Sequence, residues 1–473
     1  SHEGNARESM TMGEGPGSLR KDIIAAISTA WGESGIAIVR LSGSGSRDLV
    51  DSIFKGGGGL GPSPPRFMKH GFILDADGEP VDEVLAVWFK GPYSYTGEEA
   101  AEIHCHGGTV AARKCLELCL RGGARMARPG EFTKLAFLNG RIGLAEAESV
   151  LGVIRARSDG ALKAAAKCLQ GRLSDRLTSI LEELTDLSAA AEASMNHPEE
   201  DIPEVSAPDY LQRLSKATRR MRDLLSAARA GRFLRDGIGV AISGRPNVGK
   251  SSLMNAFLEE SRSIVTSMPG TTRDVIEEVI SHKGVPLRLT DTAGIRDPRD
   301  LAEEEGVKRS LEAIKEADIR VWVIDGSEPI TADDRRIAAS LQDSCCVIAV
   351  NKSDLPLSVD PGEVKGLIPG REVRVVSAVT GQGLDELKDL IVLSVSGSTT
   401  VDEDVNTTER QVEEIREALA LLEEAEGVLA SGVDLDAALG LLAGSRECLS
   451  RILGLSTDED LLDRIFSNFC IGK

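Results

Sequence analysis

A stretch near the middle of the chain, GRPNVGKSS at 244–252, has the residue types and spacing that bind phosphate. It follows an apolar run that predicts a strand and precedes a segment that predicts a helix. Gly244 and Gly249 let the backbone wrap so that its N–H groups face phosphate oxygens. The Lys250 ammonium suits the β- and γ-phosphates, and the Ser251 hydroxyl suits Mg²⁺. These residues predict a P-loop that binds a nucleotide.

Later motifs, in the order expected of such a domain, indicate that the base is guanine. DTAG at 291–294 ends an apolar strand, where Asp291 can hold the Mg²⁺ shell and the Gly294 N–H can meet the γ-phosphate. NKSD at 351–354 ends another strand. The Asp354 carboxylate can accept hydrogen bonds from guanine N1–H and the 2-amino group, whereas adenine has neither donor there.

Two neighbouring pairs complete the expected base site. Asn351 and Lys352 would brace the loop and cover the base. Ser377 and Ala378, after another apolar strand, would present backbone N–H to guanine O6. Four elements in this order predict a guanine-nucleotide-binding domain.

The groups that would carry out hydrolysis are less easily recognised. PGTTRD at 269–274 suits a switch segment ordered by the γ-phosphate and Mg²⁺, with Thr272 as the metal ligand. Hydrolases of the Ras kind place a glutamine after DTAG to orient water, but here that position is Ile295. No arginine finger is evident, so the site needs another water-orienting group and another source of positive charge.

Two features could fill these gaps. Asn247, inside the P-loop, offers a side-chain oxygen close to the phosphates, where a monovalent cation could sit. Glu303, Glu304 and Glu305 could swing back as a base. Composition alone favours a solvated helix start for these glutamates.

The elements that must position these residues form four regions. Alternating apolar strands and helices over 237–397 predict a parallel sheet covered on both faces. Residues 22–140 mix strand-like runs with one helix near 109–121 and predict an α+β domain. Residues 141–236 and 398–473 predict helices. We expect the α/β domain to be inserted into one helical domain, because neither helical part alone buries its apolar stripes; two independent helical domains are the alternative.

Composition limits the classes of function. The net charge of −20 disfavours tight unaided binding to nucleic acid, so RNA would need a local basic patch or a basic partner. No apolar run reaches the roughly 18–20 residues of a membrane span. Residues 1–21 lack a secretory signal and are interpreted as a disordered tail or a cloning remnant. The eight cysteines, without a C-x-x-C pair, are typical of a reduced compartment.

From about residue 22 to its end, the chain resembles the MnmE (TrmE) family of tRNA modification GTPases. The stretches that carry the resemblance are GIAIVRLSG, YTGEEAAEIHCHGG, ARPGEFTKLAFLNGRIGLAEAE, GRPNVGKSSLMNA, IVTSMPGTTRD, DTAGIR and the terminal DLLDRIFSNFCIGK. The resemblance implies a potassium-activated GTPase without an arginine finger, in which the guanine-nucleotide domains of two subunits meet head to head. K⁺ at that interface would supply the missing charge.

By matching positions, the resemblance assigns ligands to each group. K⁺ would be held by Asn247, Thr266, Met268 and Thr271, and Mg²⁺ by Ser251 and Thr272. The water-orienting glutamate falls on Glu303, which replaces the solvated-helix interpretation for that residue. The catalytic candidates are Glu303, Lys250 and Cys470. The residues expected to bind GTP are Asn247, Val248, Gly249, Lys250, Ser251, Ser252, Thr266, Thr271, Thr272, Asp291, Thr292, Ala293, Gly294, Asn351, Lys352, Asp354, Ser377 and Ala378.

The resemblance also implies that residues 22–140 are similar to folate-dependent aminomethyltransferase domains and dimerise. They would bind a one-carbon donor of the 5-formyl-tetrahydrofolate type through Arg40, Glu102, Arg141 and Lys473. Position 141 is Arg where some members have Lys, which keeps the charge but changes the hydrogen-bond geometry.

Two smaller motifs have competing interpretations. Cys470 lies four positions from the end, but CIGK is a poor prenylation box; a functional thiol beside the folate site and a buried packing cysteine both remain open. In HCHGG at 104–108, His104 and His106 share a strand face and suggest a metal site, yet no further cluster completes one, which favours strand packing near the pterin.

The leading hypothesis is a potassium-activated GTPase in tRNA modification. With the FAD protein MnmG (GidA), as a heterotetramer that holds tRNA mainly through the partner, it would install an aminomethyl or carboxymethylaminomethyl group at C5 of the wobble uridine. GTP hydrolysis would drive dimerisation and opening of the guanine-nucleotide domains. The alternative is a regulatory or ribosome-assembly GTPase that acts by binding only. We expect a cytoplasmic homodimer, or a mitochondrial or plastid protein if the source is eukaryotic.

Overall fold

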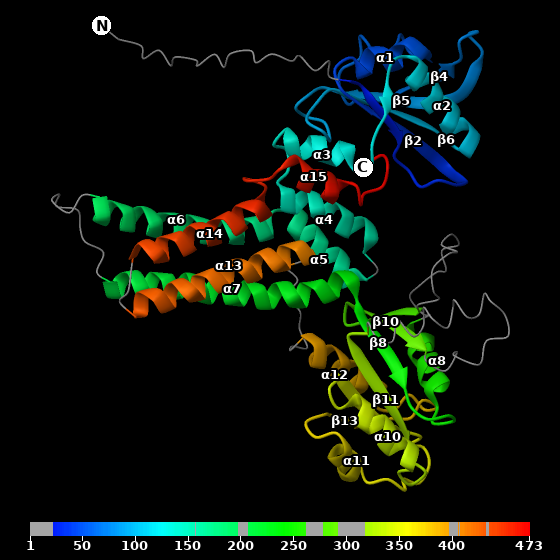
Figure 1. Ribbon diagram of the computed structural model, residues 1–473. Helices are drawn as coiled ribbons and strands as arrows, with labels where there is room; N and C mark the ends of the chain where they lie inside the picture. Colours follow the sequence, from blue (N-terminus) through cyan, green and yellow to red (C-terminus); the bar gives the residue numbers. More distant parts are fainter. Residues whose placement is uncertain are drawn as a thin grey trace. The chain divides into compact units, whose positions relative to one another are not determined.

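The computed structural model describes residues 22–156, 158–196, 207–261, 278–291, 317–396, 405, 407–431 and 435–473 (Figure 1). The chain divides into two compact units. One combines the chain up to Ile142 with Asp458–Lys473, and the other comprises Gly143–Thr457. None of the described helices combines the length and the apolar character that crossing a membrane requires.

The first unit is built on a seven-stranded sheet in the order β3-β4-β5-β6-β2-β1-β7. Its neighbouring strands are antiparallel except for β1 and β7. The strands are β1 Ile24–Ile27, β2 Ser34–Ser42, β3 Phe54–Lys55, β4 Lys69–Leu74, β5 Pro80–Phe89, β6 Ala100–Gly107 and β7 Arg125–Met126. The helices are α1 Ser46–Ile53, α2 Thr109–Arg121, α3 Glu131–Leu138 and α15 Glu459–Phe466. The predicted helix near 109–121 is confirmed as α2.

Alternation along β2 and β6 separates a core face from a pocket face. Val39 and Leu41 on β2, with Ile103 and Cys105 on β6, enter the core that α1 and α2 cover. The intervening side chains, such as Arg40 and Glu102, therefore point to the other face.

The chain's last residues complete this unit, which differs from the predicted boundary. Residues 398–473 were expected to form the second helical part, but Asp458–Lys473 pack with the N-terminal domain instead. The Ser28 hydroxyl donates to the Gly472 carbonyl at 3.0 Å, and the Phe132 N–H donates to the Lys473 carbonyl at 3.2 Å. A Cβ on Gly472 would lie 2.5 Å from the Ile27 carbonyl oxygen, so only glycine fits where the tail crosses β1.

The second unit contains a helical bundle and an α/β domain. The bundle consists of α4 Leu144–Arg155, α5 Asp159–Leu169, α6 Arg172–Asn196, α7 Ala207–Asp236, α13 Glu409–Ala430 and α14 Leu435–Leu453. Its main core contains residues that precede the α/β domain in the sequence and residues that follow it. Examples are Leu184 and Leu214 before it, and Leu422 and Leu449 after it. Helices α7 and α13 pack together, as do α6 and α14 (Figure 1). A single core built from both helical segments is what we expect if the α/β domain is inserted into one helical domain.

The α/β domain has a six-stranded sheet in the order β13-β12-β11-β8-β10-β9. Its elements are β8 Ile238–Ser243, α8 Lys250–Ser261, β9 Glu278–His282, β10 Val285–Asp291, β11 Ile319–Asp325, α10 Ala332–Leu341, β12 Cys346–Asn351, α11 Pro361–Leu367, β13 Val373–Val375 and α12 Leu384–Ser396. Separate hydrophobic clusters cover its two faces, as predicted. The sheet is parallel except for β9, an antiparallel edge strand that the sequence did not predict.

Candidate functional site

The loop between β8 and α8 has a backbone shape that only its glycines allow. Gly244 and Gly249 have φ values of 153° and 95°, and Asn247 also has a positive φ of 67°. A Cβ on Gly244 would lie 2.4 Å from the Val323 carbonyl oxygen, and a Cβ on Gly249 would lie 2.3 Å from Asn351 Nδ2. Glycine is therefore needed at both positions, because the backbone has a positive φ and because a side chain would collide with a neighbouring atom.

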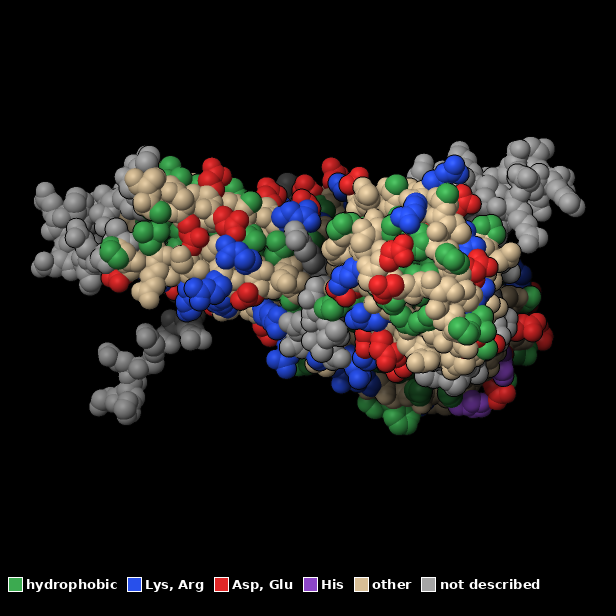
Figure 2. Space-filling view, turned by 90° about the horizontal axis from the view of Figure 1, so that it is seen from below, with side chains coloured by type: hydrophobic (Ala, Val, Ile, Leu, Met, Phe, Trp, Pro, Cys, Tyr) green, Lys and Arg blue, Asp and Glu red, His purple; other side chains and the backbone are tan. Residues whose placement is uncertain are grey.

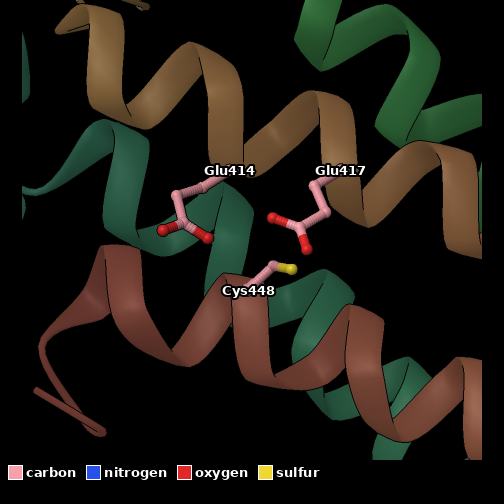
Figure 3. Close-up of side chains that lie close together, drawn as sticks. All are labelled: Glu414, Glu417 and Cys448. Atoms are coloured by element: carbon pink, nitrogen blue, oxygen red, sulfur yellow. The ribbon is translucent and has the colours of Figure 1, made fainter.

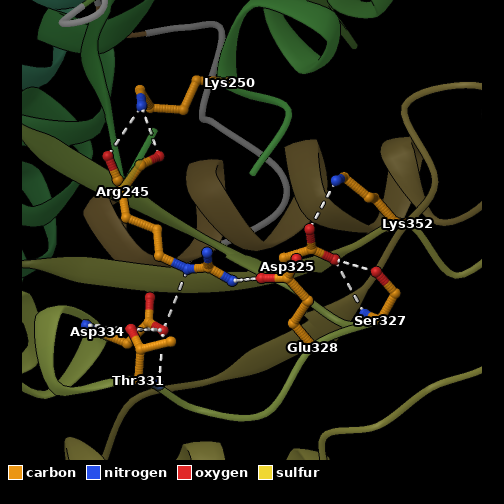
Figure 4. A network of polar contacts seen from close by, with 9 residues as sticks. Arg245, Lys250, Asp325, Ser327, Glu328, Thr331, Asp334 and Lys352 are labelled. Carbon is orange, nitrogen blue, oxygen red and sulfur yellow. Dashed lines mark hydrogen bonds and ion pairs between the residues drawn. The ribbon is translucent and has the colours of Figure 1, made fainter. Parts of the chain in front are cut away.

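Lys250 opens α8 and turns back over the loop. Its Nζ lies 2.9 Å from the carbonyl oxygens of both Gly244 and Arg245 (Figure 4). Ser251 and Ser252 follow in the exposed first turn of α8. A helix N-terminus with a lysine over a glycine-rich loop suits phosphate oxygens.

The base-recognition motifs lie at the carboxyl ends of neighbouring strands, beside this loop. Asn351 ends β12 and is buried; its Nδ2 donates to the Val248 carbonyl at 2.9 Å. The Ser377 hydroxyl donates to Asp354 Oδ1 at 2.6 Å. The structure thus brings together the P-loop, the 351–354 motif and the 377–378 motif, which the sequence separates widely.

One predicted donor is already engaged. The Ala378 N–H was expected to meet guanine O6, and here it donates to Asn351 Oδ1 at 3.0 Å. The same contact ties the two base-site loops together.

Part of the predicted site lies outside the described residues. This applies to Thr266, Met268, Thr271, Thr272, Thr292, Ala293, Gly294 and Glu303, which stay predictions. Asp291 closes β10, which pairs with β8, so its backbone lies beside the strand that leads into the P-loop.

The first unit carries a second candidate site, a pocket of about 380 Å³. Arg40 and Glu102 are directly opposed across β2 and β6, and Arg40 Nε donates to Glu102 Oε1 at 2.9 Å. Within the described structure, the buried Arg40 Nη1 has no hydrogen-bond partner. The functionally relevant lining residues are Arg40, Arg66, Tyr93, Tyr95, Glu102, Phe132 and Arg141.

Aromatic rings support the cations of this pocket. The Arg40 guanidinium lies 5.2 Å from the Tyr95 ring centroid and 5.8 Å from that of Phe132. Arg141 lies 5.5 Å from the Tyr95 centroid and donates to the Tyr95 carbonyl at 2.6 Å. Sequence reasoning did not assign roles to the aromatic residues or to Arg66, although Tyr93 and Tyr95 stand together in the short polar segment before β6.

Lys473, also predicted for this site, does not line the pocket, but its charge interacts with those of Arg40 and Glu102. Burial lowers the pKa of the Lys473 ammonium, and the charge of Arg40 lowers it further, whereas Cys470 and Glu102 act in the opposite direction. Burial alone would raise the pKa of Glu102, but hydrogen bonds from His104 and Arg40 and their charges lower it overall. The pocket therefore keeps an ionised carboxylate among cations.

The HCH motif lies on β6 and is explained by local pairing. His104 Nε2 lies 3.2 Å from Glu102 Oε2, while His106 Nδ1 lies 2.7 Å from Asp82 Oδ1. Within the described residues, these histidines do not join a metal-ligating cluster. This agrees with the strand-packing interpretation.

Cys470 is exposed, so its interpretation as a buried packing cysteine is wrong. Its backbone contacts the start of α3, where the Cys470 carbonyl accepts from the Gly130 N–H at 3.4 Å. Its role as a functional thiol stays a prediction.

Glu414, Glu417 and Cys448 also lie together, between α13 and α14 (Figure 3). Arg451 already occupies this cluster: its Nη2 lies 2.7 Å from Glu414 Oε2 and 3.3 Å from Cys448 Sγ. Burial, followed by the nearby Glu417 charge, raises the pKa of Cys448 to about 11, so the sulfur is a thiol. We interpret the group as an ion pair that joins two helices.

A P-loop next to a base site of the NKxD type defines the α/β domain as a guanine-nucleotide-binding domain of a P-loop GTPase. Residues 23–141 match the family described as GTP-binding protein TrmE N-terminus, and residues 144–470 match the MnmE helical domain. The chain belongs to the MnmE (TrmE) family of tRNA modification GTPases.

The sequence matches those of its relatives over almost the whole length of both chains. The chain is 44% identical to the tRNA modification GTPase MnmE of Geobacter sulfurreducens, covering 96% of this chain and 99% of that one. It is 42% identical to the Aquifex aeolicus MnmE, covering 96% of this chain and 100% of that one. Among solved structures, it is similar to the G domain of the T. maritima FeoB iron transporter, with 28% identity over 33% of this chain and 98% of that chain, at a TM-score of 0.25. The two MnmE relatives, which match over nearly the full length, show that the chain is a GTP hydrolase that acts in tRNA modification.

Proposed function

We propose that the chain joins GTP hydrolysis to one-carbon transfer at C5 of the wobble uridine of tRNA. A 5-formyl-tetrahydrofolate-type donor would occupy the N-terminal pocket and supply the carbon. With an FAD protein of the MnmG (GidA) type, the product would be an aminomethyl or carboxymethylaminomethyl group. The observation that carries this proposal is the Arg40–Glu102 pair on the pocket wall, with one Arg40 nitrogen buried and free of a described partner.

The residues present fit such a donor. A pterin offers amino and ring N–H groups that an ionised Glu102 can accept, and its flat ring suits a wall of Tyr95 and Phe132. The spare Arg40 Nη1, with Arg141, suits a glutamyl or formyl oxygen. Lys473 would add charge from the docked tail.

Binding of the donor is the direct test. Calorimetry with 5-formyl-tetrahydrofolate should give a clear heat for the full chain, and Glu102→Gln should weaken binding at least about tenfold, since it removes charge-assisted acceptors. Glu83→Gln is the matched control because Glu83 pairs with His70 on an exposed strand. No heat with the unmodified protein would overturn the folate part of the proposal and leave its GTPase part standing.

For the GTPase site we propose Mg²⁺ at Ser251 and Thr272, and K⁺ at Asn247, Thr266, Met268 and Thr271. The exposed Ser251 hydroxyl at the start of α8 and the exposed Asn247 side chain fit hard cations, while the other ligands lie outside the described residues. K⁺, when bound, would supply the positive charge that an arginine finger supplies elsewhere. Two such domains would meet head to head with GTP and part after hydrolysis, with Glu303 orienting the water.

A partner that holds tRNA is consistent with the charge of this chain. The net charge is −20, and the face in Figure 2 mixes Lys and Arg with Asp and Glu. Such a surface gives phosphate backbones little net attraction. We therefore assign most of the tRNA contact to the MnmG-type partner.

A further inference from the structure

Asp325, at the end of β11, lies beside the guanine site but in none of its motifs. It is cross-strand partner to Asn351 of β12 and is only 3% exposed. Its Oδ2 accepts from Lys352 Nζ at 2.6 Å, and its Oδ1 accepts from the Ser327 N–H at 3.0 Å and hydroxyl at 2.6 Å (Figure 4). The carboxylate is thus fixed on one side by its own loop and bonded on the other to Lys352.

Lys352 needs such an anchor. Its backbone has a φ of 66°, a left-handed conformation that L residues other than Asn and Asp rarely adopt. Its long side chain has four rotatable bonds, so an unanchored ammonium would sample many positions. The bond to Asp325 fixes the ammonium, and with it the aliphatic stem that is available to cover a base.

Asp325 stays ionised in this setting. Burial would raise its pKa, but the hydrogen bonds from Lys352 and Ser327 and the Lys352 charge lower it overall. The ion pair therefore persists at neutral pH.

The segment that follows Asp325 is itself fastened to the P-loop. Arg245 Nη2 lies 2.5 Å from Glu328 Oε2, and Arg245 Nε lies 3.3 Å from Asp334 Oδ2 (Figure 4). The Asp334 side chain is buried and forms part of the capping box of α10. Residues 325–334 therefore contact both the phosphate loop, through Arg245, and the base loop, through Lys352. Asp325 itself is held by Lys352 and Ser327, and the segment that follows it is held by Arg245.

We propose that Asp325 is a positioning residue for guanine-nucleotide binding, which acts through Lys352 and does not touch the nucleotide. It fixes the lysine stem over the base plane before the nucleotide arrives. The proposal depends on guanine-nucleotide binding alone and is independent of potassium and folate.

Asp325→Asn tests it with little change in shape. We expect binding of GDP and of GTP to weaken equally, by about tenfold, with kcat at saturating GTP unchanged. Asp333→Asn is the control, because Asp333 is an exposed residue of the same domain that pairs only with Arg336 among the described residues; its Kd should not change. A wild-type Kd for Asp325→Asn, or a loss confined to kcat, would overturn the proposal.

A double-mutant cycle tests the route through Lys352. If Asp325 acts through Lys352, the double variant Asp325→Asn with Lys352→Met should bind GDP no more weakly than Lys352→Met alone. Losses that multiply would refute this route. If Asp325→Asn does not fold, Ser327→Ala loosens the same carboxylate and should weaken GDP binding about twofold to threefold at unchanged kcat; an unchanged Kd would then count against the proposal.

Discussion

The Ser377 hydroxyl lies 2.6 Å from Asp354 Oδ1, so the carboxylate expected to read guanine is held by a fully buried neighbour. The same hydroxyl oxygen accepts from the Val379 and Thr380 N–H groups at 3.3 and 3.1 Å. It therefore links the turn after β13 to the base-reading loop. The orientation of Asp354 therefore depends on Ser377 as well as on its own loop.

Ser377→Ala should weaken GDP binding by about tenfold, because a hydrogen bond to a charged group contributes about 1.5–3 kcal/mol and part of that orients Asp354. Fluorescence titration with a labelled GDP measures the change. Ser340→Ala removes another serine hydroxyl, one that is exposed and bonded to the Ile337 carbonyl, and should have no effect. Equal affinity in both variants would refute the orienting role.

Potassium should accelerate GTP turnover relative to sodium at matched ionic strength. The physical reason is that a cation at Asn247 would neutralise transition-state charge without a protein arginine. Steady-state phosphate release in KCl and in NaCl measures it. Identical rates with the two salts would remove K⁺ from the proposed site.

Glu303→Ala should leave GTP affinity nearly intact and reduce turnover by roughly 10²–10³-fold, as is typical of losing a water-positioning or acid–base group. Glu304→Ala and Glu305→Ala are matched neighbours and should retain turnover. A wild-type rate for Glu303→Ala would show that another residue orients the water.

Gly472→Ala should displace the tail and weaken binding of 5-formyl-tetrahydrofolate by about tenfold, since the new Cβ would lie 2.5 Å from the Ile27 carbonyl oxygen. Gly78→Ala is the control: Gly78 also has a positive φ, 84°, but its Cβ would meet nothing within 4 Å. Calorimetry compares the two. Equal affinities would mean that the tail does not contribute to the pocket.

Acid should remove the stabilisation that Glu102 provides. Its pKa is lowered in the folded state relative to its ordinary value of 4.5. The contribution is therefore present above that value and is lost as pH falls through the folded pKa. In urea unfolding followed by tryptophan fluorescence, any advantage of the wild type over Glu102→Gln should shrink from about pH 6 to about pH 3. An advantage that grows in acid would contradict the assigned direction.

Local signals in the sequence predicted the P-loop, the base-reading motifs and the shared helical core, since each depends on nearby residues or on helical periodicity. Strand β9 was not predicted, because EVISH at the sheet edge is short and only partly apolar. Strand β4 contains Gly71, whose Cβ would lie 2.5 Å from the Lys55 carbonyl oxygen. Packing, not propensity, places this glycine in a strand.

Features that depend on register or on distant contacts could not be predicted from spacing. The opposition of Arg40 and Glu102 follows from the pairing of β2 with β6. The ion pair between Asp325 and Lys352 depends on β11 and β12 ending at the same edge. In each case the sequence held the residues, while the sheet brought them together.

The docking of Gly472 onto Ser28 also constrains how the protein is made. During synthesis the first domain emerges long before residues 458–473, which cover part of it, because Gly143–Thr457 lie between them in the sequence. The surface along β1 that these residues cover therefore stays exposed while the guanine-nucleotide domain and the rest of the bundle are synthesised. Assembly of the N-terminal domain is therefore complete only after residues 458–473 have been made, and a chain cut before Asp458 would keep the described guanine-nucleotide elements while this domain stayed unfinished.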